Sequence, residues 1–198
     1  GGGSLTALPI IETEAQDISA YIPTNLISIT DGQIYLSPTL FALGVLPAVD
    51  VGMSVSRVGG KAQRVAYRGV TGELKLAYAQ FEELEIFSRF GARLDDDTRS
   101  IIEHGRRIRA CLRQREFAPL SVAAQIAILL ALNEKIFDNV LLDQMAEAER
   151  AVREAATNIP YEITKRLNDA DKLREEDRAA IVAIVDAALA PFPRKSNN

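Results

Sequence analysis

Charge and glycine are distributed unevenly along the 198 residues, and this limits the folds open to the chain. Residues 1–60 contain five acidic residues, one basic residue and eight of the twelve glycines, whereas residues 61–198 contain 22 acidic and 22 basic residues. Little charge with frequent Gly and Pro is typical of short strands joined by turns. Dense charge with apolar residues at helical spacing is typical of solvated helices. We therefore expect two regions, with a boundary near Gly59-Gly60.

The first region, residues 1–60, contains several short apolar runs. Residues 5–11 predict a buried strand, and residues 22–29 form a second apolar stretch in this strand-like region. A turn signal precedes a short strand at 33–36, and alternating residues predict another strand at 49–58. Because these runs are short, we do not expect residues 1–60 to form a stable domain alone.

The second region, residues 61–190, predicts a bundle of about six helices with short connections. Apolar residues recur at helical spacing from Leu74 to Phe87, and Gly91 is expected to end that helix. The next helix follows three aspartates and runs to about Arg113. Residues 122–137 are apolar nearly all round, which indicates a central buried helix. Three further helices are expected near residues 142–157, 162–173 and 181–188, and residues 191–198 form a tail.

Composition excludes several classes of protein. The formal net charge of −4 argues against a dedicated nucleic-acid binder. Cys111 is the only cysteine, so no disulfide can form within the chain. The longest apolar run, residues 120–132, is too short to span a membrane, which takes about 20 residues.

Most candidate reactive residues have simpler structural interpretations. The opening glycines lack the Gly-Lys-Ser/Thr ending of a phosphate-binding loop. Acidic residues at 95–97 suit the start of a helix better than a metal site. His104 has no second ligand in its motif and is expected to be a surface or packing residue, and Cys111 a small buried one. A run of basic residues is a candidate phosphate patch, but is expected instead to lie on a solvent-facing helix and to pair with nearby acids; its members are Arg106, Arg107, Arg109, Arg113 and Arg115.

Arg57 stands apart because it is the only cation in residues 1–60 and follows an apolar strand. Ligands of open α/β sheets bind beyond the carboxyl ends of strands, and a guanidinium there can bind phosphate oxygens bidentately. The alternative is a structural salt bridge to Asp31 or Glu12. The residues alone leave both interpretations open.

Several motifs together resemble the alpha subunits of the rotary ATP synthase family. They are ALPIIET at 7–13, AYIPTNLISITDGQI at 20–34, VGMSVSRVG at 51–59, LKLAYAQF at 74–81, FSRFG at 87–91 and PLSV at 119–122. The match runs through about residue 137 and more loosely beyond it. The segments ISITDGQ and SVSRVG favour the alpha subunit over its catalytic paralogue, the beta subunit.

The resemblance implies a mainly α chain with a truncated α/β part. Residues 1–60 would be the last strands of a P-loop (RecA-like) nucleotide-binding domain, and residues 61–190 the C-terminal helical domain. Arg57 falls on the family's arginine finger, which reaches a nucleotide in a neighbouring beta subunit. Ser28 matches a family serine near the same phosphate region. Ser54 matches a family serine that lies in the finger strand and holds Arg57 in position.

The resemblance also implies a second, non-catalytic adenine pocket, where this chain departs from the family pattern. Leu46 replaces an arginine before Pro47, and Glu116 replaces a glutamine, whereas Gln114 is retained. Loss of an arginine and of an amide weakens the case for adenine nucleotide at these positions.

The family further implies ATP or ADP and Mg²⁺ in the intact complex, with no cofactor or metal expected in this chain alone. Expected partners are beta subunits, the gamma central stalk and the delta/b peripheral stalk, with no nucleic acid. The complex would lie on the cytoplasmic side of the bacterial plasma membrane and couple ATP synthesis or hydrolysis to proton or sodium transport. The alternative from another class is a stand-alone helical protein-interaction module without a nucleotide role. A small enzyme using Glu12 and Glu14 ranks third.

Overall fold

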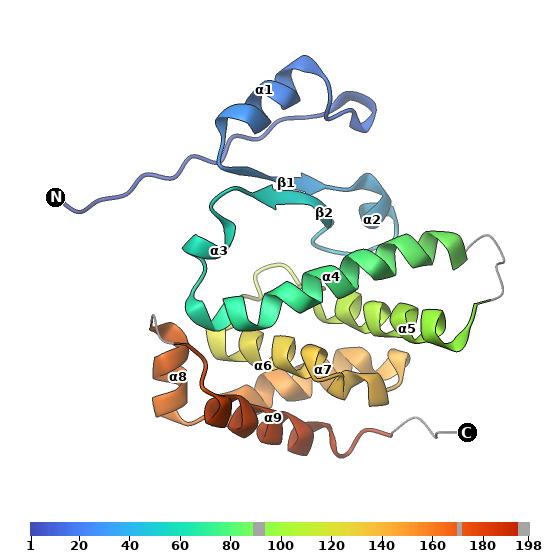
Figure 1. The fold of residues 1–198 in the computed structure, drawn as a ribbon, viewed down its shortest axis with the longest axis vertical. Helices are drawn as coiled ribbons and strands as arrows, with labels where there is room; N and C mark the ends of the chain where they lie inside the picture. Colours follow the sequence, from blue (N-terminus) through green and yellow to red (C-terminus); the bar gives the residue numbers. More distant parts are fainter. Residues whose placement is uncertain (89–93, 170–171, 194–198) are drawn as a thin grey trace.

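A computed structural model describes residues 1–88, 94–169 and 172–193. A small N-terminal layer with one two-stranded sheet lies against a bundle of helices (Figure 1). The described residues are mostly helical, which confirms the predicted fold class of helices with a small α/β part. The expected end of a helix at Gly91 and most of the tail lie outside the described residues.

The N-terminal layer alternates short helices and strands. Its elements are the 3₁₀ turn η1 (Glu14–Gln16), α1 (Tyr21–Ile29), β1 (Gly32–Leu36), α2 (Pro38–Ala42), β2 (Val49–Ser56) and α3 (Gly59–Ala62). Both strands predicted at 33–36 and 49–58 are therefore present. They pair antiparallel, with Gly32 opposite Ser56, Leu36 opposite Val49, and an irregularity between Gln33 and Tyr35.

Two expectations for this layer are wrong. Residues 5–11 form no strand, and Leu5 and Ile10 are each 97% exposed. A strand needs a hydrogen-bonded neighbour, and no described segment pairs with these residues. The second apolar stretch is helix α1 rather than part of a strand-like region. Pro23 lies in its first turn, where the missing N–H would be unpaired in any case.

In the part of the chain that the structure describes, six longer helices form the bundle, as expected. They are α4 (Val65–Ser88), α5 (Asp96–Cys111), α6 (Val122–Asn133), α7 (Met145–Ala155), α8 (Tyr161–Asn168) and α9 (Glu175–Leu189), with the 3₁₀ turns η2 (Ile136–Asn139), η3 (Leu142–Gln144) and η4 (Ala156–Asn158). The predicted helix at 122–137 therefore ends earlier, at Asn133, before the left-handed residue Lys135.

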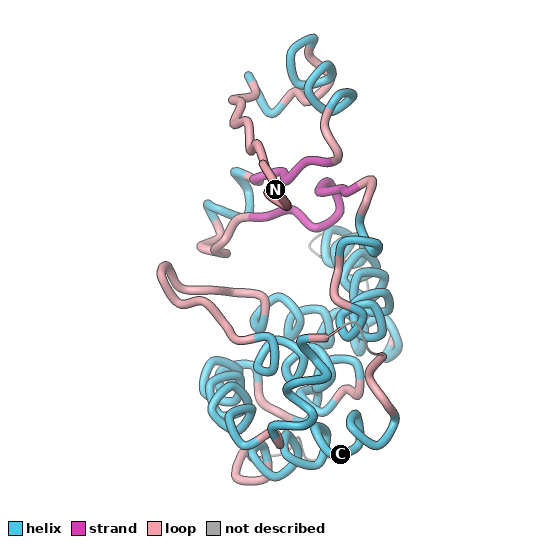
Figure 2. The backbone as a smooth tube through the Cα atoms, turned by 90° about the vertical axis from the view of Figure 1, so that its left-hand side faces the viewer, coloured by secondary structure: helices cyan, strands magenta, loops and turns pink. Residues whose placement is uncertain are grey.

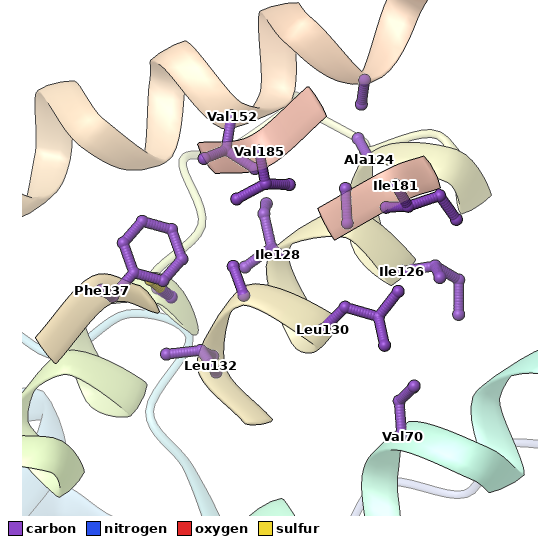
Figure 3. Packing of buried hydrophobic residues seen from close by; sticks show 14 of the residues in the cluster. Val70, Ala124, Ile126, Ile128, Leu130, Leu132, Phe137, Val152, Ile181 and Val185 are labelled. Atoms are coloured by element: carbon purple, nitrogen blue, oxygen red, sulfur yellow. The ribbon is translucent and has the colours of Figure 1, made fainter. Parts of the chain in front are cut away.

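Helix α6 is the centre of the core. Ile126, Leu130 and Leu132 have no exposed surface, because α4, α7 and α9 pack around the helix (Figure 3). Val152 of α7 and Ile181 of α9 close the same cluster. Since α6 is apolar on every side, it is stable in water only when other helices surround it.

Helices α4 and α5 approach closely at Gly105. A Cβ atom placed on Gly105 would lie 2.0 Å from Cγ of Phe81, a fully buried residue. Arg109, four residues further along α5, also packs against Phe81, with its guanidinium carbon 4.5 Å from the ring centroid, and donates to Glu85 at 2.8 Å. The absence of a side chain at Gly105 thus permits the packing of the two helices.

The basic residues of α5 do not all face solvent, which corrects the expectation. Arg107 is 1% exposed and donates to the carbonyl oxygens of Phe137, Val140 and Glu103. Burial lowers the pKa of Arg107. Its planar set of N–H donors holds α5 to the turn after α6. A pattern of charges along a helix does not reveal the Phe137 and Val140 carbonyls, which come from a distant segment.

Replacing Gly105 with Ala should destabilise the bundle. Overpacking against Phe81 outweighs the gain in helix propensity, so we expect a net loss of about 2 kcal/mol in the free energy of unfolding. Urea denaturation followed by circular dichroism measures it. Gly69→Ala is the matched control, because Gly69 lies in α4 with no atom within 4 Å of its added Cβ. Equal stabilities of the two variants would contradict the close approach.

Candidate functional site

Arg57 lies at the junction of the sheet and helix α1. Strand β2 ends at Ser56, and the next backbone N–H, that of Arg57, donates to the Asp31 carbonyl at 2.7 Å. Asp31 directly precedes β1, so the pairing of the strands fixes the backbone position of Arg57. The side chain itself is exposed.

The guanidinium of Arg57 contacts the carboxyl end of helix α1. Nη1 donates to the Ser28 carbonyl and Nη2 to the Ile27 carbonyl, each at 3.0 Å. Carbonyls in the last turn of a helix lack partners within it and form the negative end of its dipole, so a cation is favoured there. Among the described residues, Arg57 forms no ion pair with Asp31 or Glu12, the alternative considered from the sequence.

The two candidate serines occupy different positions around Arg57. Ser28 meets Arg57 through its backbone carbonyl, while its hydroxyl donates to the Asn25 carbonyl at 2.7 Å. Ser54 Oγ accepts from the Tyr35 N–H at 3.0 Å and donates to the Asp50 carbonyl at 2.5 Å. Ser54 therefore stabilises the irregular part of the hairpin and makes its hydrogen bonds away from Arg57.

The candidate adenine-pocket residues come from segments far apart in sequence. The Gln114 N–H donates to the Leu46 carbonyl at 3.0 Å, and Gln114 Nε2 donates to the Ala118 carbonyl at 3.0 Å. Arg113 also reaches this turn, donating to the Gly44 carbonyl at 2.5 Å. The fold thus brings Leu46 and Gln114 together, and Glu116 lies exposed in the same loop. This loop, drawn in yellow-green between α5 and α6, lies on the sheet side of the bundle (Figure 1).

The other candidate residues have structural environments. Asp95 caps α5, accepting from the Thr98 N–H at 2.7 Å, which confirms the capping interpretation and lowers the pKa of Asp95. His104 Nδ1 lies 2.8 Å from Asp138 Oδ1. Cys111 is buried, as expected, and burial raises the pKa of its thiol, so thiolate chemistry is disfavoured there.

A hollow of 190 Å³ lies in the bundle rather than beside Arg57. Its lining comes from the bundle region alone: Glu73, Leu74, Ala77, Gln80, Ser100, Ile101, His104, Asn133 and Lys135. Within 1–88, 94–169 and 172–193, no three His, Cys, Asp or Glu residues are grouped so that they could hold a metal ion. None of the helices in the same ranges is long and apolar enough to cross a membrane.

Thr30 was not singled out from the sequence, and Arg113 was considered only as one of the basic residues of a solvent-facing helix, although both make contacts next to the candidate residues. The Thr30 hydroxyl joins the end of α1 to the start of β1, and Arg113 joins the loop after α5 to the turn before β2. The sequence did offer a signal for Thr30, because this threonine lies between the apolar stretch at 22–29 and the turn at Asp31-Gly32. The basic run marked Arg113 but not its partner, the Gly44 carbonyl, which is 69 residues away.

Comparison with known proteins defines the class. Residues 1–56 match the nucleotide-binding domain of the ATP synthase alpha/beta family, and residues 63–188 match the C-terminal domain of the ATP synthase alpha/beta chain. The chain therefore belongs to the ATP synthase alpha/beta family.

Within this family, highly similar curated relatives include alpha subunits. The chain is 74% identical to ATP synthase subunit alpha 2 of Albidiferax ferrireducens, 73% identical to subunit alpha 1 of Marinomonas sp. and 71% identical to subunit alpha 1 of Shewanella frigidimarina. Each match covers 97% of this chain but only 36–38% of the relative. The chain thus spans little more than a third of the length of these relatives.

Replacing Gly32 with Ala should loosen the backbone beside Arg57. An added Cβ would lie 2.3 Å from the Val55 carbonyl oxygen in the facing strand. Overpacking of about 1–3 kcal/mol should speed hydrogen exchange of the Arg57 amide roughly tenfold or more. Nuclear magnetic resonance measures this exchange. Gly52→Ala is the control, because its Cβ meets only Asp50 Oδ1, at 3.4 Å, and Glu82 Oε2, at 3.8 Å. An unchanged exchange rate in Gly32→Ala would refute the tight pairing.

Proposed function

We propose that this chain acts as part of a non-catalytic alpha-type subunit of a rotary ATP synthase and supplies Arg57 to the nucleotide site of a neighbouring beta subunit. The observation that carries the proposal is the state of the Arg57 side chain. It is exposed at the end of β2, and the two described bonds of its guanidinium go to neutral carbonyls. Its positive charge is therefore not neutralised by any described carboxylate.

The remaining donors of Arg57 suit a phosphate group. A guanidinium has five N–H groups, and the carbonyls of Ile27 and Ser28 accept from two of them. Three N–H groups thus remain for oxygens from outside the described chain. In phosphoryl transfer, negative charge spreads over the equatorial oxygens of the transferred group, and an arginine supplied by a neighbour stabilises it by roughly 10³–10⁵ in rate.

ATP or ADP with Mg²⁺ would be bound mainly outside this chain. The sequence contains no Gly-Lys-Ser/Thr phosphate loop, and the described carboxylates form no metal-binding group. Arg57 would therefore act on a nucleotide that the beta subunit holds. Ser28 and Ser54 would support this role of Arg57. Ser28 supplies one of the two carbonyls that the guanidinium contacts, and Ser54 stabilises β2, the strand that leads to Arg57.

A second nucleotide site at Leu46, Gln114 and Glu116 would contribute little affinity. The hydrogen bond between Gln114 and Leu46 supports a shared pocket. However, the apolar side chain of Leu46 offers no donor to phosphate or base, and an exposed Glu116 carboxylate repels phosphate.

The helical bundle would pack against beta subunits, the gamma central stalk and the delta/b peripheral stalk. The complex would lie on the cytoplasmic side of the bacterial plasma membrane and couple to proton or sodium transport.

Replacing Arg57 tests the proposal in the assembled enzyme. Arg57→Ala should lower the rate of steady-state ATP hydrolysis by a factor of roughly 10³–10⁵. Arg57→Lys should lower it by a smaller factor, because Lys keeps the positive charge but lacks the planar donor set. Arg150→Ala is the control, since Arg150 is exposed on α7 and pairs only with Glu154 among the described residues. Hydrolysis near the wild-type rate in Arg57→Ala would overturn the proposal.

The isolated chain should bind MgATP weakly. Without a phosphate loop, the donors of Arg57 form too few contacts to offset the loss of ligand freedom, so we expect a Kd of about 1 mM or weaker. Isothermal titration calorimetry measures it. Micromolar binding would show that this chain holds the nucleotide itself and would contradict the assigned division of roles.

A further inference from the structure

The side chain of Thr30 joins the carboxyl end of α1 to the start of β1. Its hydroxyl lies 2.7 Å from the Leu26 carbonyl and 3.1 Å from the Gly32 carbonyl, so its single proton is shared between them. The Thr30 N–H donates to the same Leu26 carbonyl at 3.0 Å. Thr30 thus ties the last turn of the helix to the first residue of β1.

These contacts continue to Arg57. Gly32 pairs with Ser56 in the facing strand, and the preceding carbonyl, that of Asp31, accepts from the Arg57 N–H at 2.7 Å. The guanidinium returns to the helix end through Ile27 and Ser28. The helix end, Thr30, the strand pair and Arg57 therefore form one closed set of contacts. Figure 2 shows α1 joined to the sheet by a short loop.

This arrangement fixes the direction of the guanidinium. Two adjacent carbonyls accept from Nη1 and Nη2, so they define both the position and the plane of the group. An exposed arginine otherwise samples many rotamers, and ordering it costs up to about 2 kcal/mol. If the carbonyls are displaced, the free-energy cost of ordering Arg57 adds to the activation free energy of the reaction.

We infer that Thr30 is a positioning residue for Arg57, acting through the carbonyl end of α1. This inference rests on the proposed finger role of Arg57. Thr30 does not contact Arg57 directly, and its hydroxyl is satisfied within the chain. Its contribution is preorganisation: the donors of Arg57 are aimed before the nucleotide arrives.

The first test is made on the 198-residue chain by nuclear magnetic resonance of ¹⁵N-labelled arginine. The Nη signals of Arg57, assigned by their loss in Arg57→Lys, should be resolved because hydrogen bonds slow rotation of the group. Thr30→Val, which keeps the shape but removes the hydroxyl, should merge these signals. Thr30→Ser should keep them resolved, as should Thr24→Val, a control in the first turn of α1. Resolved signals in Thr30→Val would overturn the inference.

The second test uses the assembled enzyme with its full-length subunits. Thr30→Val should lower kcat about tenfold and leave KM unchanged, because only the alignment of the transition-state contact is lost. Thr30→Ser should retain wild-type kcat. Equal losses in the Ser and Val variants, or a normal kcat in Thr30→Val, would overturn the role of the hydroxyl.

Arg57→Ala, measured alongside, separates this inference from the proposed function. An inactive Arg57→Ala with a fully active Thr30→Val would reject the positioning role and keep the finger. A fully active Arg57→Ala would reject the finger, whatever the resonance signals show.

Discussion

The structure depends first on the burial of helix α6. Val122–Asn133 is apolar on every side. At a surface, this helix would expose apolar side chains to water in any orientation, so other helices must surround it. Helices α4, α7 and α9 each present an apolar stripe to it, and their charged faces remain outside. Two further constraints shape the surrounding helices. Gly105 lets α5 approach Phe81, and Arg107 satisfies the carbonyls of the turn after α6.

The candidate site depends on a different principle, since the N-terminal layer contributes little to the core. Its order comes from backbone hydrogen bonds between β1 and β2 and from the unpaired carbonyls at the end of α1. Those carbonyls bind Arg57 without neutralising its charge, which a carboxylate would do. An arginine that is oriented but still cationic is suited to phosphate.

The bundle could be predicted from the sequence because its signals are local and repeated. Periodic apolar residues located the six helices, and Asp95 marked the start of α5. Residues 5–11 and α1 were misjudged because short apolar runs suit either strand or helix, and neighbours decide between them. The buried state of Arg107 could not be predicted either, since the Phe137 and Val140 carbonyls that it binds are 30 and 33 residues away.

By itself, the sequence determined the family, the helical period after residue 60, and Arg57 as the single cation of the first region. These features reside in residue identity and spacing along the chain. Only the tertiary structure decided that the Arg57 guanidinium binds the end of α1 instead of the carboxylate of Asp31 or Glu12, and that Gln114 meets Leu46. The physical reason is that backbone carbonyls are present at every residue, so folding alone determines which of them are left unpaired and where they point.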